Sequence, residues 1–135
     1  MKMSFKFSQR SENNLIGVNP NLINVVRRAL EITNVDFTVI EGLRTLERQK
    51  SLYAQGRTMP GNVVTWTMKS KHIDGLAVDL LPVVGGWDGD FLSISRAMLN
   101  SASDLGVNIR WGADWNQNGR PYEKGEFDSP HFEIA

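Results

Sequence analysis

The chain contains two histidines, and each lies close to a carboxylate at the edge of a short hydrophobic segment. His72 lies in "SKHIDGLAVDL", seven residues before Asp79, and His131 lies in "FDSPHFEIA", three residues after Asp128. Two imidazoles and one carboxylate are a ligand set typical of open, catalytic zinc sites, and a second carboxylate is a candidate base. The chain has no cysteine, which excludes disulfides and zinc sites built on thiolates.

His72 and Asp79 can meet only if the chain reverses between them. Residues seven apart in an uninterrupted strand point to opposite faces, because side chains alternate along a strand. Asp74 and Gly75 form a turn signal, and a reversal there lets the two side chains converge. Asp79 also lies inside the apolar run "GLAVDLLPV". A carboxylate buried there is costly unless a cation or hydrogen bonds satisfy it.

Each of these features also has a purely structural explanation. A histidine near an aspartate is commonly a surface pair or a hydrogen-bonded core imidazole, and the segment around His131 reads as a turn followed by a strand. Asp128, before Ser129 and Pro130, is typical of an Asx turn. Spacing alone therefore leaves both a metal site and a structural role open.

Three helices that would position these residues are predicted from apolar periodicity and capping residues. Asn19 and Pro20 begin the first, Thr45 and Gly56 bound the second, and Asp90 and Gly106 bound the third. The first is expected to bury Leu22, Val25, Val26, Ala29 and Leu30, and the third Phe91, Ile94, Met98, Ala102 and Leu105.

Strands are predicted at 36–43, 63–67, 75–83, 108–111 and 131–135, where β-branched and apolar residues gather. The polar segment 112–130 between the last two strands is long enough to suggest a function. Helices and strands that mix without strict alternation indicate an α+β fold with a small, mainly antiparallel sheet.

Bulk composition restricts the class of protein. At 135 residues the chain is expected to form one domain, 1–135, and we expect a monomer. Its 15 basic and 15 acidic residues balance, and no block of Lys or Arg predicts a nucleic-acid partner. The chain has no run of ~20 apolar residues, so membrane insertion is not predicted. The N-terminus lacks the apolar region of a signal peptide, so we expect synthesis in the cytoplasm.

A second ion site is suggested by "DWNQNG". Asp114, Asn116 and Asn118 have the D-x-N-x-N-G spacing that opens an EF-hand calcium loop, and Gly119 occupies the turn position. The twelfth position is Gly125 rather than glutamate, with Glu123 and Glu126 on either side. The alternative is a hydrophilic loop in which the Asn-Gly pair makes a tight turn.

Four segments resemble one known family. "SKHIDGLAVD" resembles the S-x-H-x-x-G-x-A-x-D signature of the zinc D-Ala-D-Ala and L-Ala-D-Glu metallopeptidases, the VanY-like group that includes bacteriophage endolysins. "RWGADW" is similar to the family block R-W-G-G-D-W, with Ala113 in place of one glycine. "DSPHFE" matches D-x-P-H-F-E, and "EGLRTLERQKSLYAQGRT" resembles the upstream helix. The motifs follow the family's order over about residues 40–133.

The resemblance implies a role for each candidate residue. His72, Asp79 and His131 would hold one Zn²⁺ that activates a water molecule, and Asp128 would be the catalytic base and then the proton donor. Arg44 would hold a substrate carbonyl or carboxylate. Substrate would also contact Ser70 and Trp115, and Glu133 would orient a ligand. The implied fold is Hedgehog/DD-peptidase-like, without a separate wall-binding domain.

The implied substrate is the peptidoglycan stem peptide. The expected activity is that of an endolysin, which cleaves the L-Ala–D-Glu bond and so lyses the host. The protein would be made in the host bacterial cytoplasm and would reach the cell wall through a pore made by another protein. D-Ala-D-Ala carboxypeptidase activity is the main alternative, because the metal motif does not separate the two bonds. A non-catalytic, zinc-stabilised binding module is the second, and a zinc amidase that cuts at the sugar–peptide junction is less favoured by the order of the motifs.

Overall fold

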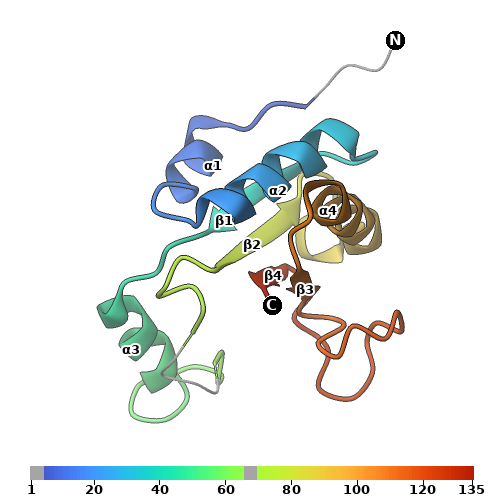
Figure 1. Cartoon of the computed structure of the whole chain (residues 1–135). Coiled ribbons are helices and arrows are strands. Elements are labelled where there is room, and N and C mark those ends of the chain that lie inside the picture. Colours follow the sequence, from blue (N-terminus) through green and yellow to red (C-terminus); the bar gives the residue numbers. More distant parts are fainter. Residues whose placement is uncertain (1–4, 66–69) are drawn as a thin grey trace.

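The computed structural model describes residues 5–65 and 70–135 (Figure 1). Within them lies an antiparallel sheet whose strands run, in spatial order, β1 (Phe37–Glu41), β2 (Ala77–Pro82), β4 (His131–Ile134) and β3 (Ile109–Trp111). The predicted α+β class with a small antiparallel sheet is confirmed.

Two helices cover one face of this sheet. α2 (Pro20–Ile32) and α4 (Phe91–Leu105) pack side by side, and α1 (Gln9–Asn14) lies against β1 (Figure 1). α3 (Leu46–Ala54) stands away from the sheet, beyond the end of β1. No helix in the described ranges is long and apolar enough to cross a membrane.

Helix boundaries follow the capping residues that the sequence predicts. Asn19, Thr45 and Asp90 are the N-caps of α2, α3 and α4, and the side chain of each accepts a hydrogen bond from a backbone amide of the first turn. Gly106 ends α4 in the left-handed conformation, φ 69°. Local sequence chemistry therefore fixes where these helices begin and where α4 ends.

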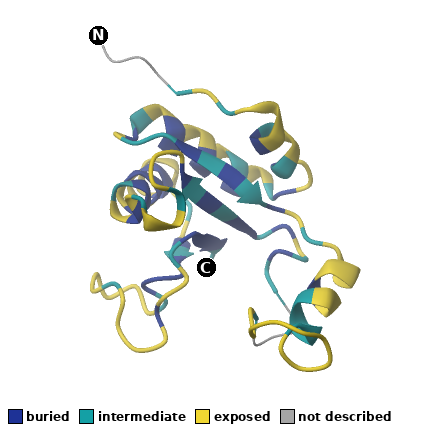
Figure 2. Ribbon diagram, turned by 180° about the vertical axis from the view of Figure 1, so that it is seen from behind, coloured by how far each residue is buried: buried dark blue, intermediate teal, exposed yellow. Residues whose placement is uncertain are grey.

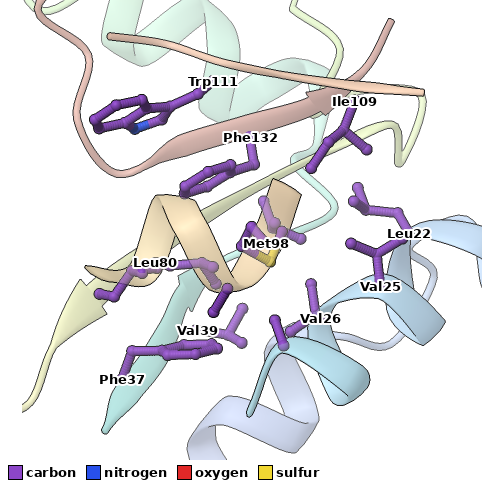
Figure 3. Close-up of a cluster of buried hydrophobic side chains, with 14 of the residues drawn as sticks. Leu22, Val25, Val26, Phe37, Val39, Leu80, Met98, Ile109, Trp111 and Phe132 are labelled. Carbon is purple, nitrogen blue, oxygen red and sulfur yellow. The ribbon is translucent and has the colours of Figure 1, made fainter. Parts of the chain in front are cut away.

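The core lies between the helices and the inner face of the sheet (Figure 3). The whole predicted stripe of α2 is buried. Val39, Leu80 and Phe132 point from neighbouring strands toward Met98 of α4. Trp111 stacks on Phe132, with ring centroids 6.2 Å apart. This apolar layer fixes the strands in place. The opposite face of the same strands carries the polar candidate residues.

Two short elements were missed, and two predictions need correction. α1 and the short 3-10 helix η1 (Gly86–Asp88) were not predicted, because six and three residues are too short to show a periodic pattern. Leu105 is 45% exposed rather than buried, because it lies in the last turn of α4, where no following turn covers it. Residues 63–65 form no strand, and the remainder of the predicted 63–67 strand lies outside the described residues.

Candidate metal centre

Strand alternation places the candidate ligands on the outer face of the sheet, away from α2 and α4. Val78 and Leu80 of β2 enter the core, so Asp79 between them points to the other side. In β4, Phe132 enters the core, and His131 and Glu133 point outward with Asp79. Asp79 and His131 are direct partners across the two strands. The register of the sheet therefore brings these two side chains together.

His72 reaches the same place from the turn before β2. Gly75 adopts φ +71° in this turn, so the predicted chain reversal is confirmed. The imidazole is 2% exposed, and its Nδ1–H donates to the carbonyl of Gly42 over 2.9 Å. The other ring nitrogen, Nε2, lies 3.2 Å from Oδ1 of Asp79.

Gly42 allows the end of α1 to pack closely against the backbone that follows β1. A Cβ at position 42 would lie 1.9 Å from the carbonyl oxygen of Asn14, so no other residue fits there without moving α1. The amide of Arg44 donates to the carbonyl of His72 over 2.9 Å, which joins the turn to the end of β1.

His131 is oriented from its other side by Glu133. Its Nε2 lies 2.8 Å from Oε1 of Glu133, and its Nδ1 lies 3.3 Å from Oδ1 of Asp79. Glu133 is in turn paired with Lys71 at 3.2 Å and Arg110 at 3.5 Å. A carboxylate behind an imidazole fixes the ring and raises its basicity, which is the arrangement found behind histidine ligands of zinc.

One ligand atom from each of His72, Asp79 and His131 lies within 4.8 Å of the other two. Burial raises the pKa of Asp79, but hydrogen bonds from His131 and His72 outweigh it and hold that pKa far below its ordinary value. Burial lowers the pKa of His131, whereas bonds to Asp79 and Glu133 raise it, to about 9 overall. The three side chains thus form a cluster with strong charge coupling, suited to a divalent cation.

Asp128 stands beside this cluster on the segment that leads into β4. Its Oδ2 lies 3.9 Å from Nδ1 of His131, and its side chain is 53% exposed. Partial burial raises its pKa, and the negative charge of Asp79 adds to this rise. His131, His72 and the Arg44 guanidinium lower the pKa, but by less, so it stays above the ordinary value. A carboxyl with a raised pKa beside a metal centre can both accept and donate a proton.

Gly112 holds the Asp128 segment in place. Its amide donates to the carbonyl of His131 over 2.7 Å, and its carbonyl accepts from the amide of Asp128 over 3.1 Å. A Cβ at position 112 would lie 2.3 Å from the carbonyl oxygen of Asp128. The glycine of "RWGADW" therefore serves close backbone packing.

Arg44 is held by two residues that the sequence did not single out. Its guanidinium makes two parallel 2.8 Å bonds to Glu41 and a 2.7 Å bond to Oε1 of Gln49. Glu41 lies at the end of β1 and Arg44 in the loop before α3, so helical spacing could not have predicted this pair. Gln49 is fully buried, and although it lies in the segment "EGLRTLERQKSLYAQGRT", nothing there distinguishes it from the exposed polar residues around it. Arg44 is thus fixed rather than solvated, with two of its five N–H groups left over.

The remaining candidates, Ser70 and Trp115, also border the cluster. The amide of His72 donates to Oγ of Ser70 over 3.2 Å, so this serine shapes the turn. The ring of Trp115 lies 5.3 Å from that of His131.

A cleft of about 570 Å³ opens over the cluster. The views from front and back both place α3 on one side of β4 and the 112–130 loop, which is exposed over most of its length, on the other (Figures 1 and 2). The cleft is lined by Ile40, Glu41, Arg44, Arg48, Leu52, Val64, Thr65, Ser70, Lys71, His72, Asp79, Trp87, Trp115, Asp128, His131 and Glu133. Another hollow, of about 660 Å³ between Phe5 and Asp90, holds neither histidine.

In the loop predicted to bind calcium, backbone amides donate hydrogen bonds to the side-chain oxygens of the same loop. Asp114 is 9% exposed and accepts from the amides of Asn118 and Gly119, at 3.2 and 2.9 Å. Asn116 also accepts from the amide of Asn118. Glu126 is 4% exposed; its Oε2 accepts from the amide of Asn116, while its buried Oε1 has no hydrogen-bond partner among the described residues.

Comparison with known proteins identifies similar chains. The family model for phage L-alanyl-D-glutamate peptidases matches residues 3–135. The L-alanyl-D-glutamate peptidase of Escherichia phage T5 is 36% identical over 141 residues, which cover 98% of this chain and 100% of the relative.

Two solved structures show the same fold. The Serratia marcescens L-Ala D-Glu endopeptidase ChiX matches with a TM-score of 0.77 and 33% identity, over 98% of this chain and 91% of that one. The vancomycin-resistance D,D-dipeptidase VanXYg matches with a TM-score of 0.55 and 22% identity, over 87% of this chain and 50% of that one. The expected DD-peptidase-like fold is confirmed.

Proposed function

The chain belongs to the phage L-alanyl-D-glutamate peptidase family, and we propose that it is a zinc-dependent endopeptidase that hydrolyses the L-Ala–D-Glu bond of the peptidoglycan stem peptide. The observation that carries the proposal is the meeting of two imidazoles and one carboxylate within 4.8 Å beneath a cleft. The relatives named for this bond support the choice of substrate.

The ligand set fits zinc. Nε2 of His72 and Nδ1 of His131 face Asp79, while the other ring nitrogens are bonded to Gly42 and Glu133. With Asp79 these are three ligands, the number that catalytic zinc sites take from protein. A zinc ion held there would supply Lewis-acid chemistry and make water nucleophilic at neutral pH.

Asp128 supplies the proton transfer in this proposal. A carboxylate oxygen takes a proton from the attacking water, and the resulting carboxyl returns it to the nitrogen of the departing D-Glu. The raised pKa of Asp128 suits both steps.

Arg44 positions the substrate. Glu41 and Gln49 fix the guanidinium, so its two remaining N–H groups have a set direction. We assign them to a carbonyl or carboxylate of the stem peptide. Ser70 and Trp115, at the rim of the cluster, contact the same peptide.

Mass spectrometry of peptidoglycan digested by the zinc-loaded protein tests this function. We expect fragments with a new N-terminal D-Glu. Released D-Ala would instead support the carboxypeptidase alternative, and intact peptidoglycan that retains the zinc-loaded protein would support a binding module.

The biological role in this proposal is host lysis. The protein would act as a monomer, made in the host cytoplasm and released to the wall through a pore formed by another protein. Sedimentation of the purified protein checks the monomer, and lysis of host cells only when a pore-forming protein is co-expressed checks the route.

Calcium in the 112–130 loop is a separate part of the proposal. It is supported by the buried Oε1 of Glu126, which has no hydrogen-bond partner in the described part of the chain, together with the oxygens of Asp114, Asn116 and Asn118. Titration of the zinc-loaded protein with CaCl₂, followed by Tm, should show a rise that Mg²⁺ does not reproduce and that Glu126→Gln abolishes. A Tm that calcium leaves unchanged refutes this site.

A further inference from the structure

Two side chains that line the cleft differ chemically. α3 contributes Arg48 to the lining of the cleft, and η1 contributes Trp87. Figures 1 and 2 show α3 and the 112–130 loop on opposite sides of β4, and the yellow segment of Figure 1 that contains η1 lies beside α4, on the side of the loop. A substrate that spans the metal centre therefore meets a cation from α3 and an aromatic ring from η1.

Arg48 is the cation available to an anionic substrate. Arg44 is bonded to Glu41, so its charge is matched and its two remaining N–H groups suit a neutral carbonyl of the stem peptide. Lys71 is likewise paired with Glu133. Arg48 is exposed, and its side chain has no partner within residues 5–65 and 70–135. It also lies in the first turn of α3, where the helix dipole disfavours a positive charge. A bound carboxylate would relieve that disadvantage.

Trp87 is the exposed aromatic residue that η1 contributes to the cleft. It is 65% exposed although indole is among the most apolar side chains, and its nearest ring, Phe91, is tilted with centroids 6.4 Å apart. One face of the indole is therefore open to a ligand. Flat, weakly polar surfaces of this kind suit the C–H face of a sugar ring.

The proposed substrate has the matching asymmetry, and this step rests on the proposed function. On the amine side of the scissile bond, D-Glu carries a free α-carboxylate next to the nitrogen, because the peptide continues through its γ-carbonyl. On the carbonyl side, L-Ala is joined directly to the lactyl group of the N-acetylmuramoyl sugar. One side is thus anionic within one residue of the bond, and the other is a neutral saccharide.

We propose that the cleft fixes the direction of the stem peptide, with the D-Glu α-carboxylate on Arg48 and the N-acetylmuramoyl ring on Trp87. Arg48 then discriminates between substrates with a free α-carboxylate and those in which it is an α-carboxamide. Trp87 discriminates between sugar-linked and free stem peptides.

The Arg48 contact is tested with paired synthetic muramoyl peptides that contain D-Glu or D-isoglutamine. The wild-type protein should have a kcat/KM about 5-fold higher for the carboxylate, the size expected of one exposed charge contact. Arg48→Gln should bring this ratio to about one, and Lys50→Gln, an equal charge change on the exposed side of α3, should keep it. An undiminished ratio in Arg48→Gln overturns the contact.

The Trp87 contact is tested by the ratio of kcat/KM for a muramoyl-linked peptide to that for the same peptide without sugar. Trp87→Ala should lower this ratio about 5-fold, Trp87→Phe should restore most of it, and Leu92→Ala, an exposed apolar residue outside the cleft, should leave it unchanged. If Trp87→Ala alters the carboxylate ratio and not the sugar ratio, the direction is reversed and the proposal fails. Wild-type cleavage of the free peptide at L-Ala–D-Glu supports the proposed function whatever Trp87 does, so the two ideas can fail separately.

Discussion

The two imidazoles of the cluster present different nitrogens to Asp79. His72 uses Nδ1 for the Gly42 carbonyl and turns Nε2 inward, whereas His131 uses Nε2 for Glu133 and turns Nδ1 inward. A backbone carbonyl holds one ring and a carboxylate the other. The donor atoms are thus fixed before any ion arrives, which lowers the cost of ordering them on binding.

Replacing Asp128 separates catalysis from metal binding. Asp128→Asn keeps the size of the side chain but removes the proton acceptor, so kcat should fall by about 10²-fold or more. Zinc content, measured by atomic absorption, should stay at one per chain. Asp104→Asn on α4 is a matched control, because its side chain is also 53% exposed. Full activity in Asp128→Asn would contradict the assigned role.

The raised pKa of His131 predicts how the metal-free protein responds to pH. Its folded-state pKa of about 9 exceeds the ordinary 6.5, so the folded state binds the proton more tightly than the unfolded state does. The resulting stabilisation, up to about 3 kcal/mol, is complete below pH 6.5 and is lost as pH rises through 9. Urea unfolding of chelator-treated protein at several pH values measures this loss. His131→Gln should show a clearly weaker dependence, and an equal one would refute the assignment.

At the scale of elements, the apolar face of the sheet was more predictable than the polar one. Caps at Asn19, Thr45 and Asp90 and the stripe of α2 could be predicted from sequence, because they depend on residues within one helix. Glu41 faces Asp79 only because the β1–β2 register shifts between Val39 and Glu41. Such an irregularity arises from pairing between distant segments and leaves no local pattern.

The candidate site shows the same division. The sequence identified the types of ligand in the cluster and the turn at Gly75 that brings His72 toward Asp79. It did not identify Gln49, since a glutamine in a short polar helix has no distinctive spacing, nor Trp87, which no motif contains. Partners supplied by tertiary contacts were missed for this reason.

Gly112 couples the 112–130 loop to the metal centre, and Gly112→Ala should show it. The added Cβ would lie 2.3 Å from the Asp128 carbonyl, so the segment carrying Asp128 must move. A displacement of about 1 Å at a catalytic group costs on the order of 10²-fold in rate. Gly106→Ala is the control: it is strained at φ 69° and should cost about 1 kcal/mol of stability, but it lies at the end of α4 with open space around it. Equal kcat values for the two variants would refute the coupling.

At the scale of the whole molecule, the cluster joins the turn at His72 and the adjoining strand β2 to the distant strand β4. A bound ion stabilises the folded state alone, by about 2.7 kcal/mol at 100 times its Kd. Removing zinc with a chelator should therefore lower Tm by on the order of 10 °C. Asp79→Asn should respond much less to the chelator. A wild-type Tm that does not change after verified loss of zinc would show that the ion contributes nothing to the fold.

The direct pairing of Asp79 with His131 also has a consequence for how the sheet assembles. If β2 and β4 slipped by one residue against each other, Val78 or Leu80 would stand opposite His131, and the two ligands would no longer share a face. Only the native alignment creates the site, so metal capture during refolding reports on correct strand pairing. Zinc would then bind only to chains with the native strand pairing. Mispaired chains would remain metal-free and could be separated from native ones by their lack of metal.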